Sequence, residues 1–249
     1  MMATRALIFL LLILAGAGVA QAAPIELVSP ARQVTLLELY TSEGCSSCPP
    51  ADRWLSGFTG DARLWREIVP VAFHVDYWNS LGWRDRFSDA GYSARQQNYY
   101  RHRYVKGVYT PGFLTNGREW RNGFGIHRLP PPATGAAGVL RAVIDTDSAR
   151  VEFVPATPQP SSLVLNVAFL GFQQTSAVAG GENRGKQLVH DFVVLAFRQV
   201  AQSGGDTRHR WTLDGLSAMR PQQAGGIALW VTAGDDPTPL QATGGWLHP

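Results

Sequence analysis

Residues 38–52 have the sequence Glu-Leu-Tyr-Thr-Ser-Glu-Gly-Cys-Ser-Ser-Cys-Pro-Pro-Ala-Asp, which leads from a predicted strand into a predicted helix. The strand covers residues 34–40, because a short and mostly apolar run is typical of a strand buried on both faces. The helix begins at Pro49, since proline is tolerated in the first helical turn, where its missing N–H has no intrahelical partner. Cys45 and Cys48 therefore lie between a buried strand and the amino end of a helix.

The segments that follow predict a βαβ unit with further elements attached. A second apolar strand is expected over residues 68–75, and a helix-sized crossover separates it from the first strand. Strands joined in this way lie parallel in one sheet. Beyond them we expect a helix over 88–103, a β-hairpin that turns at Asn116-Gly117, and a final helix over 138–145. The first part of the chain is therefore predicted to be an α/β domain.

The remaining part of the chain predicts strands without helices, which favours a small β-sandwich. The strand candidates are separated by connections rich in proline and glycine, and they cover residues 151–154, 163–172, 187–199, 208–213 and 227–232. We expect the α/β domain to span residues 30–148 and an all-β, sandwich-like domain to span residues 149–249. The proline run at 130–132 is an alternative boundary.

The first 22 residues predict export. Arg5 precedes the uncharged apolar run 6–20, and Ala20-Gln21-Ala22 supplies a small-x-small cleavage site. This arrangement is typical of a secretory signal peptide, and the run is shorter than the ~20 apolar residues that a membrane-spanning helix needs. We expect a secreted or periplasmic protein with no membrane span after cleavage. The formal net charge of +3 is too small to favour nucleic-acid binding.

The cysteine content is informative because disulfides persist in exported proteins. The chain has 2 cysteines, and they lie three positions apart. A disulfide between them would close a loop of about four residues and would stabilise the fold by only ~2 kcal/mol. Reactivity or metal binding explains such a pair better than stabilisation does. A helix amino terminus also offers free N–H groups and partial positive charge, which favour the thiolate that disulfide exchange requires.

Several motifs of the first part resemble the thioredoxin superfamily. The shared features are the buried strand, the Cys-x-x-Cys pair at a helix start, and a hairpin preceded by Thr110-Pro111. More narrowly, the chain resembles an uncharacterised family of secreted thioredoxin-like proteins, a domain of unknown function. The motifs that carry this resemblance are residues 38–52, Phe73-His-Val-Asp-Tyr-Trp-Asn-Ser-Leu-Gly-Trp83, Tyr109-Thr110-Pro111, Asn116-Gly117-Arg118 and Gly181-Glu-Asn-Arg-Gly185.

The resemblance implies roles for individual residues. Cys45 would attack a disulfide, and Cys48 would resolve the mixed disulfide that forms. Glu38, the charged residue of its strand, would be a buried carboxylate that carries a proton beneath the cysteines. Pro111 matches the cis-proline that faces the cysteine pair in the superfamily, and with Thr110 it would contact the substrate. The residue before the first cysteine is glycine rather than the usual aromatic residue, so the resemblance does not indicate whether the chain oxidises or reduces.

His74, Asp76 and Trp78 alternate with apolar residues at the end of the second strand, and a continuing strand would place them on one face. Ligands gather at the carboxyl ends of strands in open α/β sheets. We therefore expect these side chains beside the cysteines, where they would bind substrate or tune the thiol. Alternatively, Cys45, Cys48 and His74 would form a copper(I) or zinc site, because thiolates and imidazole are suitable ligands.

The leading hypothesis is a thiol–disulfide oxidoreductase that acts, without a cofactor, on another extracytoplasmic protein. Two alternatives remain open on the sequence. The first is a metal chaperone, most simply for copper(I), that uses the two thiols together with the nearby imidazole. The second is a binding module in which the α/β domain is only a scaffold and the β-rich domain contacts the partner.

Overall fold

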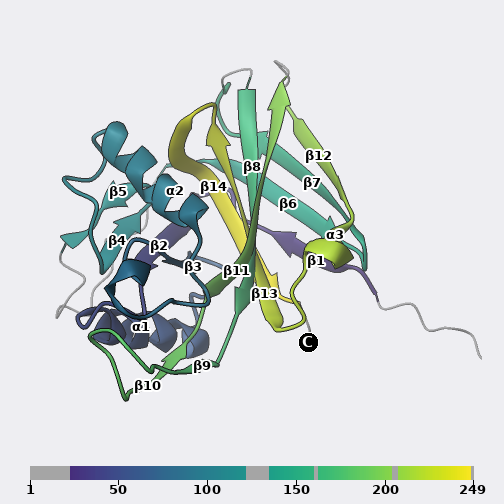
Figure 1. The fold of residues 1–249 in the computed structure, drawn as a ribbon. Helices are drawn as coiled ribbons and strands as arrows, with labels where there is room; N and C mark the ends of the chain where they lie inside the picture. The colour runs from purple at the N-terminus through teal and green to yellow at the C-terminus, as the bar shows by residue number, and fades with distance from the viewer. Residues whose placement is uncertain (1–22, 122–134, 160–161, 204–206, 248–249) are drawn as a thin grey trace, which may run out of the picture.

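The computed structural model describes residues 23–121, 135–159, 162–203 and 207–247 (Figure 1). The expected signal peptide at 1–22 and the proline run at 130–132 lie outside these ranges. The helices are α1 (Cys48–Ser56), α2 (Ala90–Arg101) and α3 (Leu216–Met219), with short 3₁₀ turns at Gly57–Gly60 and Asn79–Leu81. The strands are β1 (Ile25–Val28), β2 (Thr35–Thr41), β3 (Ile68–His74), β4 (Gly112–Thr115), β5 (Arg118–Glu119), β6 (Gly138–Ile144), β7 (Ser148–Pro155), β8 (Ser162–Gly171), β9 (Gln174–Ala177), β10 (Gln187–His190), β11 (Val193–Ser203), β12 (His209–Asp214), β13 (Ala224–Ala233) and β14 (Asp236–Trp246).

These strands form one large sheet and two smaller ones. The large sheet has eight strands in the order β14-β13-β8-β11-β3-β2-β4-β5. The second sheet has the order β1-β6-β7-β12, and β9 pairs with β10 in a two-stranded sheet. In Figure 1 the helices α1 and α2 lie beside β2 to β5, whereas β6, β7 and β12 lie at the opposite side of the molecule.

The predicted βαβ unit is confirmed at the centre of the large sheet. Strands β2 and β3 pair in parallel along their whole length, and α1 lies in the connection between them. Every residue of both strands is buried, as expected for strands covered on both faces. Helix α1 begins at Cys48, one residue before the predicted start, and has prolines in its first turn.

The next two predicted elements are also confirmed. Helix α2 is capped by Asp89, whose side chain accepts a hydrogen bond from the Gly91 N–H. Strands β4 and β5 form the hairpin, and both residues of its Asn116-Gly117 turn have positive φ, which this sequence favours. The Thr110–Pro111 peptide bond that precedes β4 is cis.

The predicted helix over 138–145 is wrong, because this segment forms strand β6. Leu140, Ala142 and Ile144 are buried while the residues between them are more exposed, and this period of two is that of a strand. Strand β6 pairs antiparallel with both β1 and β7. The expected boundary between 148 and 149 therefore falls beside the turn that joins two neighbouring strands of one sheet.

The strand candidates of the second part all correspond to observed strands. The candidate over 187–199 is divided into β10 and β11 by Asp191-Phe192, where Phe192 has a positive φ. Strands β1, β9 and β14 were not predicted. They are short or interrupted by Gly, Pro and polar residues, so their sequences carry a weak strand pattern.

Two hydrophobic cores lie on opposite faces of the large sheet, and β8 contributes to both. Leu165, Val167 and Phe169 belong to the core shared with the second sheet. Ala168 and Leu170 belong to the core that surrounds β2, β3 and the two longer helices. Because alternate residues of β8 face opposite sides, one strand connects the sandwich-like part to the α/β part.

The two parts also meet at the cysteine-bearing helix. Strand β11 pairs in parallel with β3 at Val193 and Ala72. The β9–β10 hairpin extends from this point and packs against α1 (Figure 1). Within the described ranges, no helix combines the length and apolar character that crossing a bilayer requires.

Candidate functional site

The two cysteines are free thiols at the amino end of α1, and both are buried. Cys48 is the first helical residue, and Cys45 lies in the turn before it, where the Cys48 N–H donates to the Cys45 carbonyl at 3.2 Å. The Cys45 Sγ lies 3.3 Å from the Ser47 Oγ and 3.8 Å from the Thr110 carbonyl oxygen. The structure thus brings three predicted site residues together: both cysteines and Thr110, which adjoins Pro111.

The two thiols differ strongly in acidity. A hydrogen bond from Cys48 is the largest influence on Cys45, and although burial opposes it, further hydrogen bonds from Ser47 and Thr110 help to lower the Cys45 pKa to about 6. Burial raises the pKa of Cys48 far above its ordinary value, and the Cys45 sulfur and the Asp52 charge act in the same direction. At neutral pH the pair therefore consists of a thiolate at Cys45 and a thiol at Cys48.

Trp78 occupies the space beside the first cysteine. Its indole N–H donates to the Thr110 Oγ1 at 2.8 Å. A Cβ atom added at Gly44 would lie 3.1 Å from the Trp78 Cβ, so a larger side chain at Gly44 would crowd Trp78. Trp78 thus contacts Thr110, one of the residues expected to bind substrate.

A groove of about 310 Å³ opens next to the cysteine turn. Its lining includes Ser47, Thr110, Pro111 and the half-exposed ring of Tyr109. The predicted substrate-contacting pair Thr110-Pro111 therefore borders both the Cys45 sulfur and an open cavity.

The structure places Glu38 in a different environment from the one expected. Its Oε2 accepts hydrogen bonds from Arg95 Nε at 2.9 Å and Tyr40 OH at 3.0 Å, and its Oε1 accepts one from Tyr99 OH at 2.5 Å. Arg95 and Tyr99 belong to α2, so Glu38 is directed to that helix. The carboxylate whose charge acts on Cys48 is instead Asp52, one turn further along α1.

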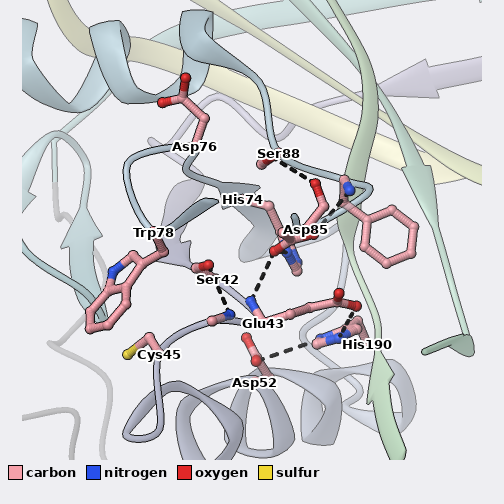
Figure 2. Close-up of polar contacts among 12 residues, drawn as sticks. Ser42, Glu43, Cys45, Asp52, His74, Asp76, Trp78, Asp85, Ser88 and His190 are labelled. Carbon is pink, nitrogen blue, oxygen red and sulfur yellow. Dashed lines mark hydrogen bonds and ion pairs between the residues drawn. The ribbon is translucent and has the colours of Figure 1, made fainter. Parts of the chain in front are cut away.

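His74 and Asp76 do not join the cysteines, because β3 ends at His74 and the alternation does not continue. The His74 Nδ1 lies 2.7 Å from the Asp85 Oδ2, and both side chains are buried. Asp76 points away from the cysteine turn and accepts a hydrogen bond from the Ser93 hydroxyl of α2 (Figure 2).

A second group of ionisable side chains lies beside α1, between this helix and His74 (Figure 2). The His190 Nε2 lies 3.4 Å from the Glu43 Oε1, and the His190 Nδ1 lies 3.5 Å from the Asp52 Oδ2. All three side chains are buried, with exposed fractions of 0–6%. Burial opposes the charge on His190, but the two carboxylates outweigh it and raise the His190 pKa to about 9. We call Glu43, Asp52 and His190 the His190 cluster.

The cluster continues towards His74. The centroids of the His74 and His190 rings are 5.0 Å apart, and the two rings are nearly perpendicular. The Trp83 indole N–H donates to the Glu43 Oε2 at 2.7 Å. Burial and the Asp85 charge work against ionisation of Glu43, but the nearby His190 ring, the Ser176 hydroxyl and the hydrogen bond from Trp83 hold its pKa below the ordinary range.

The loop 181–185 closes over the cysteine turn from the β-rich part. The buried Asn183 Nδ2 donates to the carbonyl oxygens of Glu43 and Cys45, both at 2.8 Å. The exposed Glu182 accepts a hydrogen bond from the Ser46 N–H at 2.8 Å. The resemblance included this loop as a motif without a role, and the structure places it against the backbone on both sides of the first cysteine.

The geometry does not favour the metal alternative. Across the described residues, no group of three His, Cys, Asp or Glu side chains is arranged to hold a metal ion. Cys45, Cys48 and His74 therefore do not form the three-ligand site that was considered. The side chains that sequence reasoning missed are Glu43, Asp52, Asp85, Asn183 and His190. Glu43, Asp52 and Asn183 lie within motifs of the resemblance that gave them no role, whereas Asp85 and His190 are isolated polar residues beside apolar segments.

Comparisons with known proteins show similar folds and a family. A structural-genomics protein from Agrobacterium tumefaciens has a similar solved structure, with 24% sequence identity and a TM-score of 0.63, covering 88% of this chain and 96% of that one. HBP35 of Porphyromonas gingivalis is also similar, with 13% identity and a TM-score of 0.51, covering 87% of this chain and 76% of that one. Both likenesses concern the fold alone. No curated protein matches the sequence. Residues 36–232 match a protein family over most of the chain, so the chain belongs to the family described as "Protein of unknown function (DUF1223)".

Proposed function

We propose that this protein is an exported, thioredoxin-like thiol–disulfide oxidoreductase whose attacking residue is Cys45. The observation that carries the proposal is the placement of two free, buried thiols at the amino end of α1, with the Cys45 Sγ next to the Ser47 hydroxyl and the Thr110 carbonyl. This placement agrees with a difference in acidity between the two thiols, with the pKa of Cys45 lowered to about 6 and that of Cys48 raised. Such a difference provides a nucleophile at neutral pH and keeps the second thiol protonated until it is needed. The Thr110 carbonyl oxygen, 3.8 Å from the Cys45 Sγ, and the adjoining groove support the same assignment.

The reaction consists of two exchanges. The Cys45 thiolate attacks one sulfur of a partner disulfide, which forms a mixed disulfide and releases the partner's other sulfur as a thiolate. Cys48 then loses its proton, and its thiolate attacks the Cys45 sulfur, forming the Cys45–Cys48 disulfide and releasing the partner's second thiolate. The two released thiolates take up protons. The partner is reduced by two electrons and the Cys45–Cys48 pair is oxidised, and the same steps in reverse transfer a disulfide to a partner dithiol.

Asp52 is the proposed acceptor of the Cys48 proton. It follows Cys48 by four residues in α1, so the two side chains lie on the same face of the helix. Both are buried, and the Asp52 charge acts directly on the Cys48 thiol. This assignment gives to Asp52 the role that the sequence suggested for Glu38.

The proposal is tested by thiol alkylation and mass spectrometry in glutathione buffers. We expect Cys45 and Cys48 to interconvert between dithiol and disulfide, and Cys45 to be alkylated with a pH midpoint near 6. Cys45→Ser should abolish reduction of a model protein disulfide, whereas Cys48→Ser should accumulate a mixed disulfide at Cys45. Ser46→Ala is the control, because its hydroxyl has no hydrogen bond to either sulfur. A wild-type pair that never cycles, or a Cys45→Ser variant with full activity, would contradict the proposal.

A further inference from the structure

We infer that His190, which the chain supplies from the β-rich part, is a positioning residue of the exchange site that holds a positive charge against Asp52 beneath the cysteine pair. This inference rests on the proposed function and extends it to strand β10, which lies 138 residues beyond Asp52. It makes the redox site a composite of both parts of the chain. The β-rich part would then set the reactivity of the thiols as well as packing against their helix.

The geometry around the ring supports a doubly protonated, positively charged imidazolium. The two ring nitrogens of His190 face two different carboxylates, Asp52 at 3.5 Å from Nδ1 and Glu43 at 3.4 Å from Nε2. A neutral imidazole has one N–H and would present a lone pair to one of these carboxylates, whereas an imidazolium donates from both nitrogens. The ring is 2% exposed, so water cannot screen a mismatch. The raised pKa of His190 agrees with this assignment.

The groups that face His190 come from three other elements. Glu43 comes from the turn before α1, Asp52 from α1, and His74 from the end of β3. Asp85 adjoins both His74 and Glu43, because its Oδ2 lies 2.7 Å from the His74 Nδ1 and accepts the Glu43 backbone N–H at 2.9 Å. Three carboxylates and two imidazoles are therefore enclosed together, and within the His190 cluster the imidazolium is the cation that balances the two acids.

This charge acts on the thiols through the acids. Asp52 raises the pKa of Cys48, and Glu43 lies two residues before Cys45 in the turn. With His190 charged, the negative potential that these carboxylates exert on the sulfurs is partly cancelled. Replacing His190 by a neutral side chain exposes the sulfurs to more of that negative potential, which disfavours the Cys45 thiolate. Because the thiolate belongs to the reduced form, the equilibrium then shifts from the dithiol towards the disulfide.

The test compares His190→Gln with the wild-type protein in two measurements. We expect the pH midpoint of Cys45 alkylation to rise, and the equilibrium with glutathione to shift towards the Cys45–Cys48 disulfide by about three- to tenfold, the effect of one charge near a buried site. In an Asp52→Asn background the His190→Gln substitution should have a smaller effect, because one of the two negative charges that it unbalances is absent and only Glu43 remains. His209→Gln is the control, since His209 is equally buried but stacks on Phe153 in the other core.

The outcomes separate this inference from the proposed function. A folded His190→Gln variant with wild-type midpoint and equilibrium would overturn the inference while leaving disulfide exchange intact. A wild-type pair that never cycles would overturn the proposed function. If His190→Gln fails to fold, the wild-type protein still decides the question by NMR of the histidine ring: we expect an imidazolium at pH 7, and a neutral His190 ring at that pH would overturn the inference.

Discussion

Two groups of buried charges lie where the α/β part meets the β-rich part, and they are built differently. In the Glu38 network, both oxygens of Glu38 accept hydrogen bonds of 2.5–3.0 Å from Tyr40, Arg95 and Tyr99. In the His190 cluster, both ring nitrogens of His190 lack a well-formed hydrogen bond, and their nearest carboxylate oxygens are 3.4–3.5 Å away. One group is saturated and the other is loosely paired.

The number of hydrogen bonds that a buried charge makes distinguishes a charge with a structural role from one that can exchange a proton. The Arg95 guanidinium lies over the rings of Tyr99, Phe73, Phe197 and Trp230, which joins α2 to the β-rich part. Such a pair fixes how the two parts pack and has no unpaired group with which to move a proton. The His190 cluster retains unpaired donors and acceptors next to a thiol, and this arrangement is suited to changing its protonation.

The largest expected effect comes from breaking the Glu38 network. Glu38→Gln leaves the Arg95 charge buried without its partner, so we expect the free energy of unfolding to fall by about 3–5 kcal/mol. Chemical denaturation measures this loss. The matched control is Glu67→Gln, which breaks the partly exposed pair with Arg32 and should cost no more than about 1 kcal/mol. The pH midpoint of Cys45 alkylation should not change in Glu38→Gln, and a large change would mean that this carboxylate serves the thiols after all.

The His190 cluster should instead make the free energy of unfolding depend on pH. The pKa of His190 is raised to about 9 in the folded protein, above an unfolded value near 6.5. The charged His190 therefore stabilises the folded state fully below pH 6.5, and this contribution is lost as the pH rises to about 9. The free energy of unfolding should fall by about 2–3 kcal/mol over this range. Denaturation should be followed in a Cys45→Ser, Cys48→Ser background, because the thiols titrate in the same range.

The matched variant in that background is His190→Gln. It should lack the decline between pH 6.5 and 9, so its stability curve should approach that of the parent at high pH. Parallel curves for the two proteins would show that His190 is uncharged in the folded state, and the contrast between the two groups of charges would then be lost.

The local features could be predicted from the sequence, but the contrast between the Glu38 network and the His190 cluster could not. The apolar run of β2, the cysteine turn and the Asn116-Gly117 hairpin are encoded by neighbouring residues, so they could be predicted. The identity of the buried acid that faces the thiols depends on two contacts between distant residues. Glu38 points towards α2, and His190, which lies 138 residues beyond Asp52 in the sequence, packs against Asp52. No local pattern specifies either of these contacts. The sequence of strand β6 does not reveal its period of two, because the apolar residues Val139 and Val143 occupy positions between the buried ones.

A smaller effect should come from Asp52→Asn. We expect resolution of the mixed disulfide to slow by roughly tenfold or more at pH 7, because the base that accepts the Cys48 proton is removed. At higher pH the variant should approach the wild-type rate, since the negative charge that opposes the Cys48 thiolate is also gone. Stopped-flow measurement of the second exchange at several pH values checks both expectations. A uniform decrease at every pH would indicate a packing defect instead of a lost proton acceptor.

The smallest effect is expected at the exposed carboxylate of the same site. Glu182 accepts a hydrogen bond from the Ser46 N–H, next to the reactive thiol, but it lies in water, which screens its charge. Glu182→Gln removes a negative charge near Cys45, so the pH midpoint of alkylation should move slightly down and the rate at pH 6 should rise by less than roughly twofold. High salt should remove this difference, whereas it should leave the effect of His190→Gln unchanged. Equal salt sensitivity of the two variants would contradict the assignment of His190 to a buried, unscreened position against Asp52.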